Sequence, residues 1–190
     1  MQKSKIVVIY DEKTADLGRA LVATIEKNTL ECSHFLAQAD RIKPCYSCVG
    51  CETKTFGKCV FRDDMDTILP MMAVAETWVI LTPVIWGGPS YTIKKVIDKS
   101  ALLGNRFYRV RNKELVKGAN APVQKIVFIG ISNQPNLEET KDFVFWGNEV
   151  GNIMDIESDI KIMEPEWTQE DINQIINTYI NHSDKRQVTS

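Results

Sequence analysis

Four of the five cysteines of this chain lie within one short segment, at Cys45, Cys48, Cys51 and Cys59. Four explanations are open: a disulfide, a zinc site, an iron–sulfur cluster, or packing of cysteine as a small hydrophobic residue. Zinc sites usually pair two well-separated Cys-x-x-Cys or Cys/His knuckles. Three thiolates in seven residues, with a fourth nearby, are more typical of the wrap around an iron–sulfur cube. The spacing therefore favours a four-iron cluster over zinc, and inert packing remains open.

Glycines and the remaining cysteine refine that interpretation. Gly50 and Gly57 supply the backbone freedom that a tight wrap around a cluster needs. Cys32 lies outside the segment, on an expected strand, and we expect it to be a core residue.

Composition limits the class of protein. The chain has 190 residues, of which 44% are hydrophobic and 25% charged, which suits one globular domain with a buried core. A net charge of -2 gives no basic footprint for nucleic acid. The first apolar run is too short for a signal peptide, and no stretch approaches the roughly 20 apolar residues of a membrane span. We therefore expect a cytoplasmic protein without membrane association. Structural disulfides are uncommon in the reducing cytoplasm.

Short β-branched apolar runs predict five strands. They are Lys5–Tyr10, Leu30–Leu36, Thr77–Val84, Gln124–Ile131 and Asp159–Pro165. Helical patterns separate them, over Ala15–Lys27, Met65–Glu76, Tyr91–Leu103, Leu137–Met154 and Thr168–Ile180. Asp63 or Asp64 is the expected cap of the second helix, which Pro70 should kink or split, and Thr168 is the expected cap of the last. We predict one domain over 1–182 with a cysteine-rich insertion at 41–62, followed by a frayed tail at 183–190.

Alternating strands and helices predict an α/β fold with a parallel sheet covered on both faces. Ligands of such sheets bind beyond the carboxyl ends of the strands. The informative residues are thus those just after Tyr10, Thr82 and Ile131. The cysteine segment follows the second strand, so we expect it at the same edge, as a shared cofactor site would require.

Two motifs carry a resemblance to a known family. "IKPCYSCVGCETKTFGKCVFRDDM", followed by "TPVIWGGPSYTIKKVIDKS", resembles the flavodoxin-like NAD(P)H-dependent FMN oxidoreductases, in particular their iron–sulfur flavoprotein branch. The match covers about Ile42 to Lys99, with weaker agreement around it. The resemblance implies a three-layer sandwich with five parallel strands in the order 2-1-3-4-5.

The resemblance also implies cofactors and the residues that hold them. FMN would lie along Pro83, Val84, Ile85, Trp86, Gly87 and Gly88, where glycines let backbone amides approach the ring. Ser132 and Asn133 form the third loop position. A four-iron four-sulfur cluster would be held by Cys45, Cys48, Cys51 and Cys59, and NAD(P)H would supply electrons.

The first flavin loop departs from the family pattern. Relatives carry a Ser/Thr-rich loop that holds the flavin phosphate, whereas this chain has "YDEKTADLGRA". Its acidic residues, Asp11, Glu12 and Asp16, are unfavourable beside a phosphate, although Asp16 has a second interpretation as a helix cap. Lys13, Thr14 and the helix amides near Gly18 remain as donors.

Two functions follow. The first is a flavin-dependent NAD(P)H oxidoreductase or electron-transfer flavoprotein. Its electrons would come from a nicotinamide or a ferredoxin-like donor and go to a small-molecule or protein acceptor, and the resemblance implies a homodimer or homotetramer. The second, favoured by the acidic first loop, is a flavodoxin-like domain that has lost flavin and serves as a metal-binding or protein-interaction module. No paired-carboxylate or Ser/His/Asp pattern predicts a catalytic residue, as is typical when a cofactor performs the chemistry.

Overall fold

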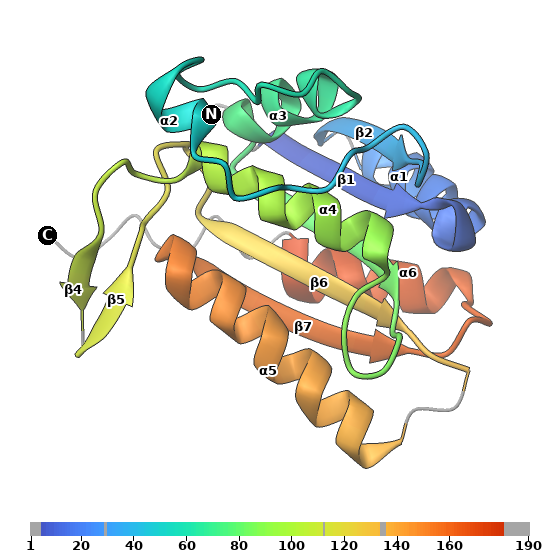
Figure 1. The fold of residues 1–190 in the computed structure, drawn as a ribbon. Helices are drawn as coiled ribbons and strands as arrows, with labels where there is room; N and C mark the ends of the chain where they lie inside the picture. The colour runs from blue at the N-terminus through green and yellow to red at the C-terminus, as the bar shows by residue number, and fades with distance from the viewer. Residues whose placement is uncertain (1–4, 29, 112, 134–135, 181–190) are drawn as a thin grey trace, which may run out of the picture.

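Five parallel strands form the centre of the computed structural model, which describes residues 5–28, 30–111, 113–133 and 136–180. The strands are β1 (Lys5–Asp11), β2 (Glu31–Ala37), β3 (Thr77–Pro83), β6 (Lys125–Ile131) and β7 (Glu157–Met163). Their order is β2-β1-β3-β6-β7 (Figure 1). This is the predicted order 2-1-3-4-5 of the five sheet strands, so the predicted α/β flavodoxin-like sheet is confirmed.

Helices cover both faces of the sheet and make the three-layer sandwich. One face packs on α3 (Met65–Val74), α4 (Tyr91–Ser100) and α5 (Leu137–Met154). The other packs on α1 (Ala15–Lys27), α6 (Gln169–Ile175) and a π-helical turn, Ile176–Ile180. Alternate residues of each central strand enter the two cores: Val7 and Ile9 face the first, and Ile6 and Val8 the second.

One helix and one hairpin differ from the sequence-based expectation. Pro70 does not split α3, which runs unbroken from Met65 to Val74. Pro70 is exposed, while Ile68, Leu69 and Met72 pack in the core, so tertiary packing compensates for the one amide that proline lacks. A small antiparallel hairpin, β4 (Arg109–Arg111) and β5 (Glu114–Val116), lies where the sequence predicts no such pair.

The remaining boundaries agree closely with the predicted ones. Helix α4 ends at Ser100 and continues as a 3₁₀ turn, Ala101–Leu103. Thr168 caps α6, since its hydroxyl accepts from the amide of Asp171 over 3.2 Å, as predicted. The predicted tail at 183–190 lies outside the described residues. Within the described ranges, no helix has the length and apolar character needed to cross a membrane.

Candidate functional site

Three loops meet at the carboxyl edge of the sheet. The strand register places Pro83 beside Ile131, and Ile131 beside Met163, so the strands end level with one another. Hydrogen bonds continue past the strands: the amide of Val84 donates to the Ile131 carbonyl over 2.8 Å, and that of Ser132 to Met163 over 2.9 Å. The loops after β3 and β6 are therefore anchored to the buried strands, and the turn after β1 lies beside β3.

The loop after β3 is a tight turn that points its apolar tip at solvent. Ile85 and Gly88 exchange two backbone hydrogen bonds, of 2.8 and 3.0 Å. The two residues between them have positive φ, 49° at Trp86 and 73° at Gly87, as in the mirror-image turns that close hairpins. Trp86 is 89% exposed. The turn thus offers a rigid backbone and a large uncovered ring at the edge of the sheet.

Gly87 and Gly88 have different roles in this turn. A Cβ atom on Gly87 would lie 2.6 Å from the Cβ of Asp142 on α5, and the residue also has positive φ. A Cβ on Gly88 would meet nothing nearer than the Ile85 carbonyl at 3.7 Å. Gly87 is therefore required by the fold, whereas Gly88 leaves open space beside the turn.

The loop after β1 is closed on itself by a carboxylate. Asp11, at the end of β1, caps a 3₁₀ turn, Glu12–Thr14. The amides of Lys13 and Thr14 and the Thr14 hydroxyl all donate to Oδ1 of Asp11, each over 3.1 Å. The Asp11 amide in turn donates to the Thr14 hydroxyl oxygen over 3.3 Å. The side chains of Asp11 and Thr14 are both buried. The donors that could bind the phosphate of a ligand are therefore already bound to the carboxylate of Asp11.

Gly18, on α1, allows the helix to pack closely against the end of β1. A Cβ there would lie 2.4 Å from the Tyr10 ring, so the glycine lets the last residues of β1 pack against α1. The Tyr10 hydroxyl lies 3.2 Å from Nδ1 of His34 on β2, and the two rings are stacked. Burial raises the pKa of Tyr10.

The predicted cofactor residues fall into two groups. Pro83 to Gly88 and Ser132 lie together at the carboxyl edge, with Asn133 exposed beside them, and Lys13 and Thr14 lie in the neighbouring loop. Asp16 does not cap α1: the cap position is Thr14, and Asp16 is exposed and paired with Arg19 over 2.5 Å. The predicted cap of α1 at Asp16 is therefore wrong, and the carboxylate of Asp11 caps the 3₁₀ turn that precedes α1.

The cysteine segment does not share this edge. After β2 the chain turns back along α4, where Nζ of Lys95 donates to the Ala39 carbonyl over 2.7 Å. It reaches Cys51 beside Ala101 and Leu102, beyond the end of α4 (Figure 1). Helix α4 begins near the carboxyl edge, where the Ser90 amide donates to Thr82, and runs to the opposite edge. The expectation of a common edge is wrong, because the segment packs antiparallel to β2 along a helix.

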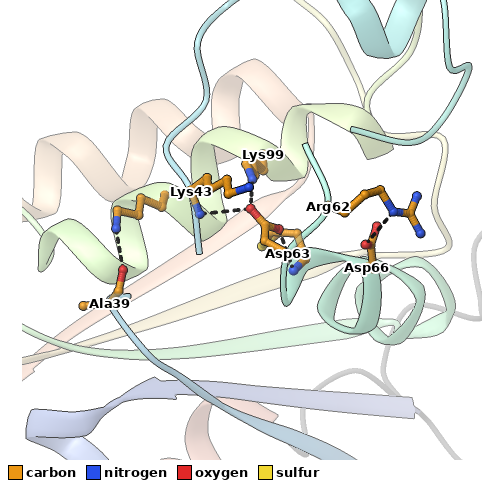
Figure 2. Close-up of polar contacts among 8 residues, drawn as sticks. Ala39, Lys43, Arg62, Asp63, Asp66 and Lys99 are labelled. Atoms are coloured by element: carbon orange, nitrogen blue, oxygen red, sulfur yellow. Dashed lines mark hydrogen bonds and ion pairs between the residues drawn. The ribbon is translucent and has the colours of Figure 1, made fainter. Parts of the chain in front are cut away.

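A buried carboxylate closes the base of the cysteine segment (Figure 2). One oxygen of Asp63 accepts from the amide of Lys43 over 2.9 Å and from Nζ of Lys99, and the other accepts from the amide of Met65 over 3.0 Å. The side chains of Asp63 and Lys99 are 4% and 1% exposed. Asp63 therefore joins the two ends of the segment to each other and to α4. We name residues 43–63 the cysteine loop.

A second ion pair lies beside that closure. Nη2 of Arg41 contacts one oxygen of Asp64 over 2.9 Å, and the Asp64 amide donates to the Arg41 carbonyl over 3.2 Å. The other Asp64 oxygen is buried and has no partner among the described residues. Of the two expected caps of α3, Asp63 is the one whose side chain accepts an amide of the first turn.

The four thiols of the cysteine loop lie in different surroundings. Cys45 and Cys48 are exposed, whereas Cys51 and Cys59 are partly buried. Burial raises the pKa of Cys51, and the nearby Glu52, Cys59 and Cys45 raise it further, against its own backbone hydrogen bond. Across the described ranges, no three His, Cys, Asp or Glu side chains are grouped as a metal site. The thiols are near one another without forming a ligand set.

The segment that carries the small hairpin covers one side of the loop. Nζ of Lys117, a nearly buried residue, contacts Oε1 of Glu52 over 2.9 Å on the short helix α2 (Gly50–Thr53). The Arg106 guanidinium lies 5.3 Å from the centre of the Phe56 ring. A cavity of about 200 Å³ separates the two parts, lined by Cys51, Glu52, Phe56 and Arg106 among others.

Three residues of the site were not predicted in their observed roles: Asp11, Asp63 and Lys99. A signal existed for the first, since Asp11 and Thr14 have the spacing of a capping box. Lys99 lies on the same helical face as Val96, which places it toward the core. The pairing of Asp63 with Lys99 joins residues 36 positions apart, and no local pattern contains it.

Comparison with known sequences gives partial matches. The chain is 30% identical over 97 residues to an iron–sulfur flavoprotein of Methanosarcina thermophila, covering 51% of this chain and 49% of that protein. It is 35% identical over 101 residues to an iron–sulfur flavoprotein of Methanocaldococcus jannaschii, covering 53% and 50%. The matches thus span about half the length of these curated relatives. No protein-family model matches the chain.

Solved structures share the fold over nearly the whole chain. An NAD(P)H:quinone oxidoreductase of Methanothermobacter marburgensis has a TM-score of 0.61 at 12% identity, covering 93% of this chain and 92% of that one. An FMN-dependent NADH-azoreductase of Bacillus anthracis has a TM-score of 0.57 at 13% identity, covering 91% and 93%. At such identities the likeness concerns the fold alone. The chain is thus similar over half its length to iron–sulfur flavoproteins, and it shares its fold with flavin-dependent reductases.

Proposed function

We propose that this protein is a flavin-dependent oxidoreductase or electron-transfer flavoprotein that uses FMN and NAD(P)H. The observation that carries the proposal is the convergence of the loops after β1, β3 and β6 at the carboxyl edge of the sheet. Ligands of open parallel sheets bind at this edge. The named relatives and the fold of flavin-dependent reductases support the same assignment.

The ring of a flavin suits the loop after β3. Val84 and Ser132 have their amides committed to the sheet, which fixes the two loops that would flank the ring. Gly88 leaves open space, and Trp86 presents an exposed aromatic face on which a planar ring could stack. The flavin would accept hydride and pass on electrons, while these residues supply binding and orientation.

The phosphate of FMN does not fit the loop after β1 as it stands. The amides of Lys13 and Thr14 and the Thr14 hydroxyl already donate to the buried carboxylate of Asp11. An incoming phosphate would find these donors occupied and a negative charge in place. The fit of the cofactor is therefore good at its ring end and poor at its phosphate end.

Two exposed aromatic residues allow a matched test of the flavin site. Trp86→Ala should weaken flavin binding at least fivefold, measured by quenching of flavin fluorescence, if the ring stacks there. Phe107→Ala is the control, because Phe107 is 80% exposed in the segment beside the cysteine loop. Both variants should unfold at the wild-type urea concentration. Equal effects of the two substitutions, or no effect of either, would contradict the placement.

We further propose that the cysteine loop holds a four-iron four-sulfur cluster. The donors match in kind, since four thiols lie within a loop whose base is fixed by Asp63. Left-handed backbone at Ser47 and Val49 already bends the segment between successive cysteines. Ligation requires the exposed thiols of Cys45 and Cys48 to turn toward Cys51 and Cys59. A bound cluster would exchange single electrons.

Metal analysis tests the cluster. Protein purified without oxygen should carry about four irons and four sulfides per chain. Replacing Cys45, Cys48, Cys51 or Cys59 with serine should remove most of that iron. Cys32→Ala is the control and should keep it, since Cys32 lies on β2, away from the loop. Stoichiometric zinc, or no metal, would refute the cluster and leave zinc binding or inert packing.

The positions of the two sites favour a homo-oligomer, a dimer or a tetramer. Helix α4, ten residues long, separates the carboxyl edge from the cysteine loop by about 15 Å of helix. We propose that a flavin and a cluster that exchange electrons belong to different subunits, which would bring them nearer to each other than the length of α4. Exposed apolar side chains beside the cysteine loop, such as Tyr46, Phe56 and Phe61, suit such a contact.

Subunit mixing tests this arrangement. At a flavin concentration that leaves the weakened site of Trp86→Ala mostly empty, this variant should show little flavin-to-cluster electron transfer. Cys51→Ser, which should lose most of its cluster iron, should show equally little. Mixed oligomers of the two should recover part of it, because one intact flavin site then faces one intact cluster. A monomeric protein in light scattering, or no recovery on mixing, would contradict the proposal.

The alternative function is a domain without flavin that binds metal or a protein partner. The occupied phosphate loop is the observation that favours it. A visible absorption spectrum separates the two functions, because flavin and iron–sulfur bands differ and zinc does not absorb visible light.

For the flavin function, the electron donor would be a nicotinamide or a ferredoxin-like protein, and the acceptor a small molecule or another protein. We propose a cytoplasmic location for either function.

A further inference from the structure

The donors of the turn after β1 already bind an anion of the chain itself, the carboxylate of Asp11. Asp11 is 3% exposed and Thr14 is 2% exposed. Three donors of the turn converge on one oxygen, Oδ1 of Asp11. The turn also lies beside β3, so it faces the edge where the flavin is proposed to bind.

The charges around the turn do not offset a second anion. Glu12 is exposed on the turn and Asp16 on the first turn of α1, and Asp16 is paired with Arg19. Lys13 is also exposed, so two cations, Lys13 and the paired Arg19, stand against three carboxylates. A phosphate monoester carries a charge of about -1.5 to -2 at neutral pH. Bringing it to the buried carboxylate would place like charges in contact with few compensating donors.

We propose that Asp11 is a specificity-determining residue which takes the place of the flavin phosphate, so that the protein recognises the ring and the ribityl chain but not the phosphate. The inference rests on the proposed flavin function. It implies that riboflavin, which lacks the phosphate, binds about as tightly as FMN. A phosphate site at this turn would make FMN bind more tightly than riboflavin, and the carboxylate of Asp11 removes most of that difference.

Flavin titrations of the purified protein, freed of bound flavin, test the inference. We expect the dissociation constants of FMN and riboflavin for the wild type to agree within about threefold, measured by fluorescence quenching. In Asp11→Asn, which keeps the capping oxygen but removes the charge, FMN should bind at least tenfold more tightly than in the wild type, and riboflavin should be unchanged. Asp11→Ser, which also shortens the side chain, should improve FMN binding as much or more.

A matched control and a competitor complete the experiment. Asp16→Asn removes the same charge from the neighbouring first turn of α1 without freeing any of the three donors, so it should change FMN binding less than threefold. Inorganic phosphate should compete with FMN in Asp11→Ser and have no effect on flavin binding to the wild type. Circular dichroism and urea unfolding check that each variant is folded.

Failure of the inference about Asp11 and failure of the proposed flavin function would give different results. If the wild type binds FMN at least tenfold more tightly than riboflavin, the inference is wrong and the flavin function stands. The same holds if neither Asp11 variant changes the ratio of the two affinities, or if Asp16→Asn changes it equally. If the wild type and both folded Asp11 variants bind neither flavin, the proposed function and the inference both fail.

Discussion

The carboxyl edge and the cysteine loop are built in opposite ways. The carboxyl edge is a continuation of buried strands, and backbone hydrogen bonds such as Val84 to Ile131 extend the sheet into the loops. The cysteine loop has few such bonds to the sheet and is held at its base by the carboxylate of Asp63. One site is shaped by the core of the fold, and the other is held by side-chain contacts, of which the pair of Asp63 and Lys99 is the most buried.

This difference suggests how each site would respond to its ligand. Stability is highest in core strands and lowest in loops with few buried contacts. The turn from Pro83 to Gly88 has its geometry before any ligand binds. The cysteine loop keeps two exposed thiols and must rearrange to gather four. A ligand of the loop would therefore contribute to its order, whereas a ligand of the edge would bind a preformed surface.

Breaking the ion pair at the base of the loop should have the largest effect. Lys99→Met leaves the buried carboxylate of Asp63 without its cation and should destabilise the protein by about 3–5 kcal/mol. Urea unfolding measures the loss, and hydrogen exchange should show faster opening of residues 43–63 than of β1 and β3.

A second lysine on the same helix provides the control. Lys94 pairs with Asp98 at the surface, and Lys94→Met should cost less than about 1 kcal/mol. Adding Asp63→Asn to Lys99→Met should recover part of the loss, since it removes the unpaired charge. A cost below 1 kcal/mol for Lys99→Met would show that the pair does not hold the loop.

Substitutions at the two neighbouring glycines of the carboxyl edge should change stability by different amounts. Gly87→Ala should destabilise by about 1–3 kcal/mol, because alanine disfavours positive φ and its Cβ would meet Asp142. Gly88→Ala is the matched neighbour and should stay within about 0.5 kcal/mol of the wild type. Urea unfolding compares them. Equal stabilities would mean that the turn is less rigid than its backbone geometry indicates.

The smallest expected effect concerns Cys32, the cysteine that belongs to the sheet. Burial raises its pKa from a usual value near 9.0 to about 12 in the folded protein. Between these values the unfolded chain loses the thiol proton first and binds fewer protons than the folded one. The free energy of unfolding must therefore fall as pH rises from 9 toward 12.

The size of this effect is modest because Cys32 is only partly buried. Its contribution at pH 10 should be at most about 1 kcal/mol after allowance for solvent screening. Urea unfolding at pH 8 and pH 10 should show a larger decrease in the wild type than in Cys32→Ala. Cys45→Ala, which changes an exposed thiol, should decrease as the wild type does. The same decrease in all three proteins would exclude Cys32 as the cause.

Local sequence determined much of the frame. The β-branched runs at residues 5–10 and 77–84 predict buried strands because burial on both faces requires continuous apolar residues. Both are observed, and the predicted sheet order is confirmed. The sequence also identified the turn around Gly87 and the concentration of thiols, since residue types and spacing alone carry those signals.

The tertiary structure decided where these features lie and what occupies them. It placed the cysteine loop at the far end of α4 from the carboxyl edge, because the direction of a long connection depends on packing that spacing does not encode. It paired Asp63 with Lys99 across 36 positions of sequence. It also turned Asp11 from an acidic residue near a phosphate loop into the group that fills the loop. Charge and residue type are local properties, whereas the partner of a buried charge is set by the fold.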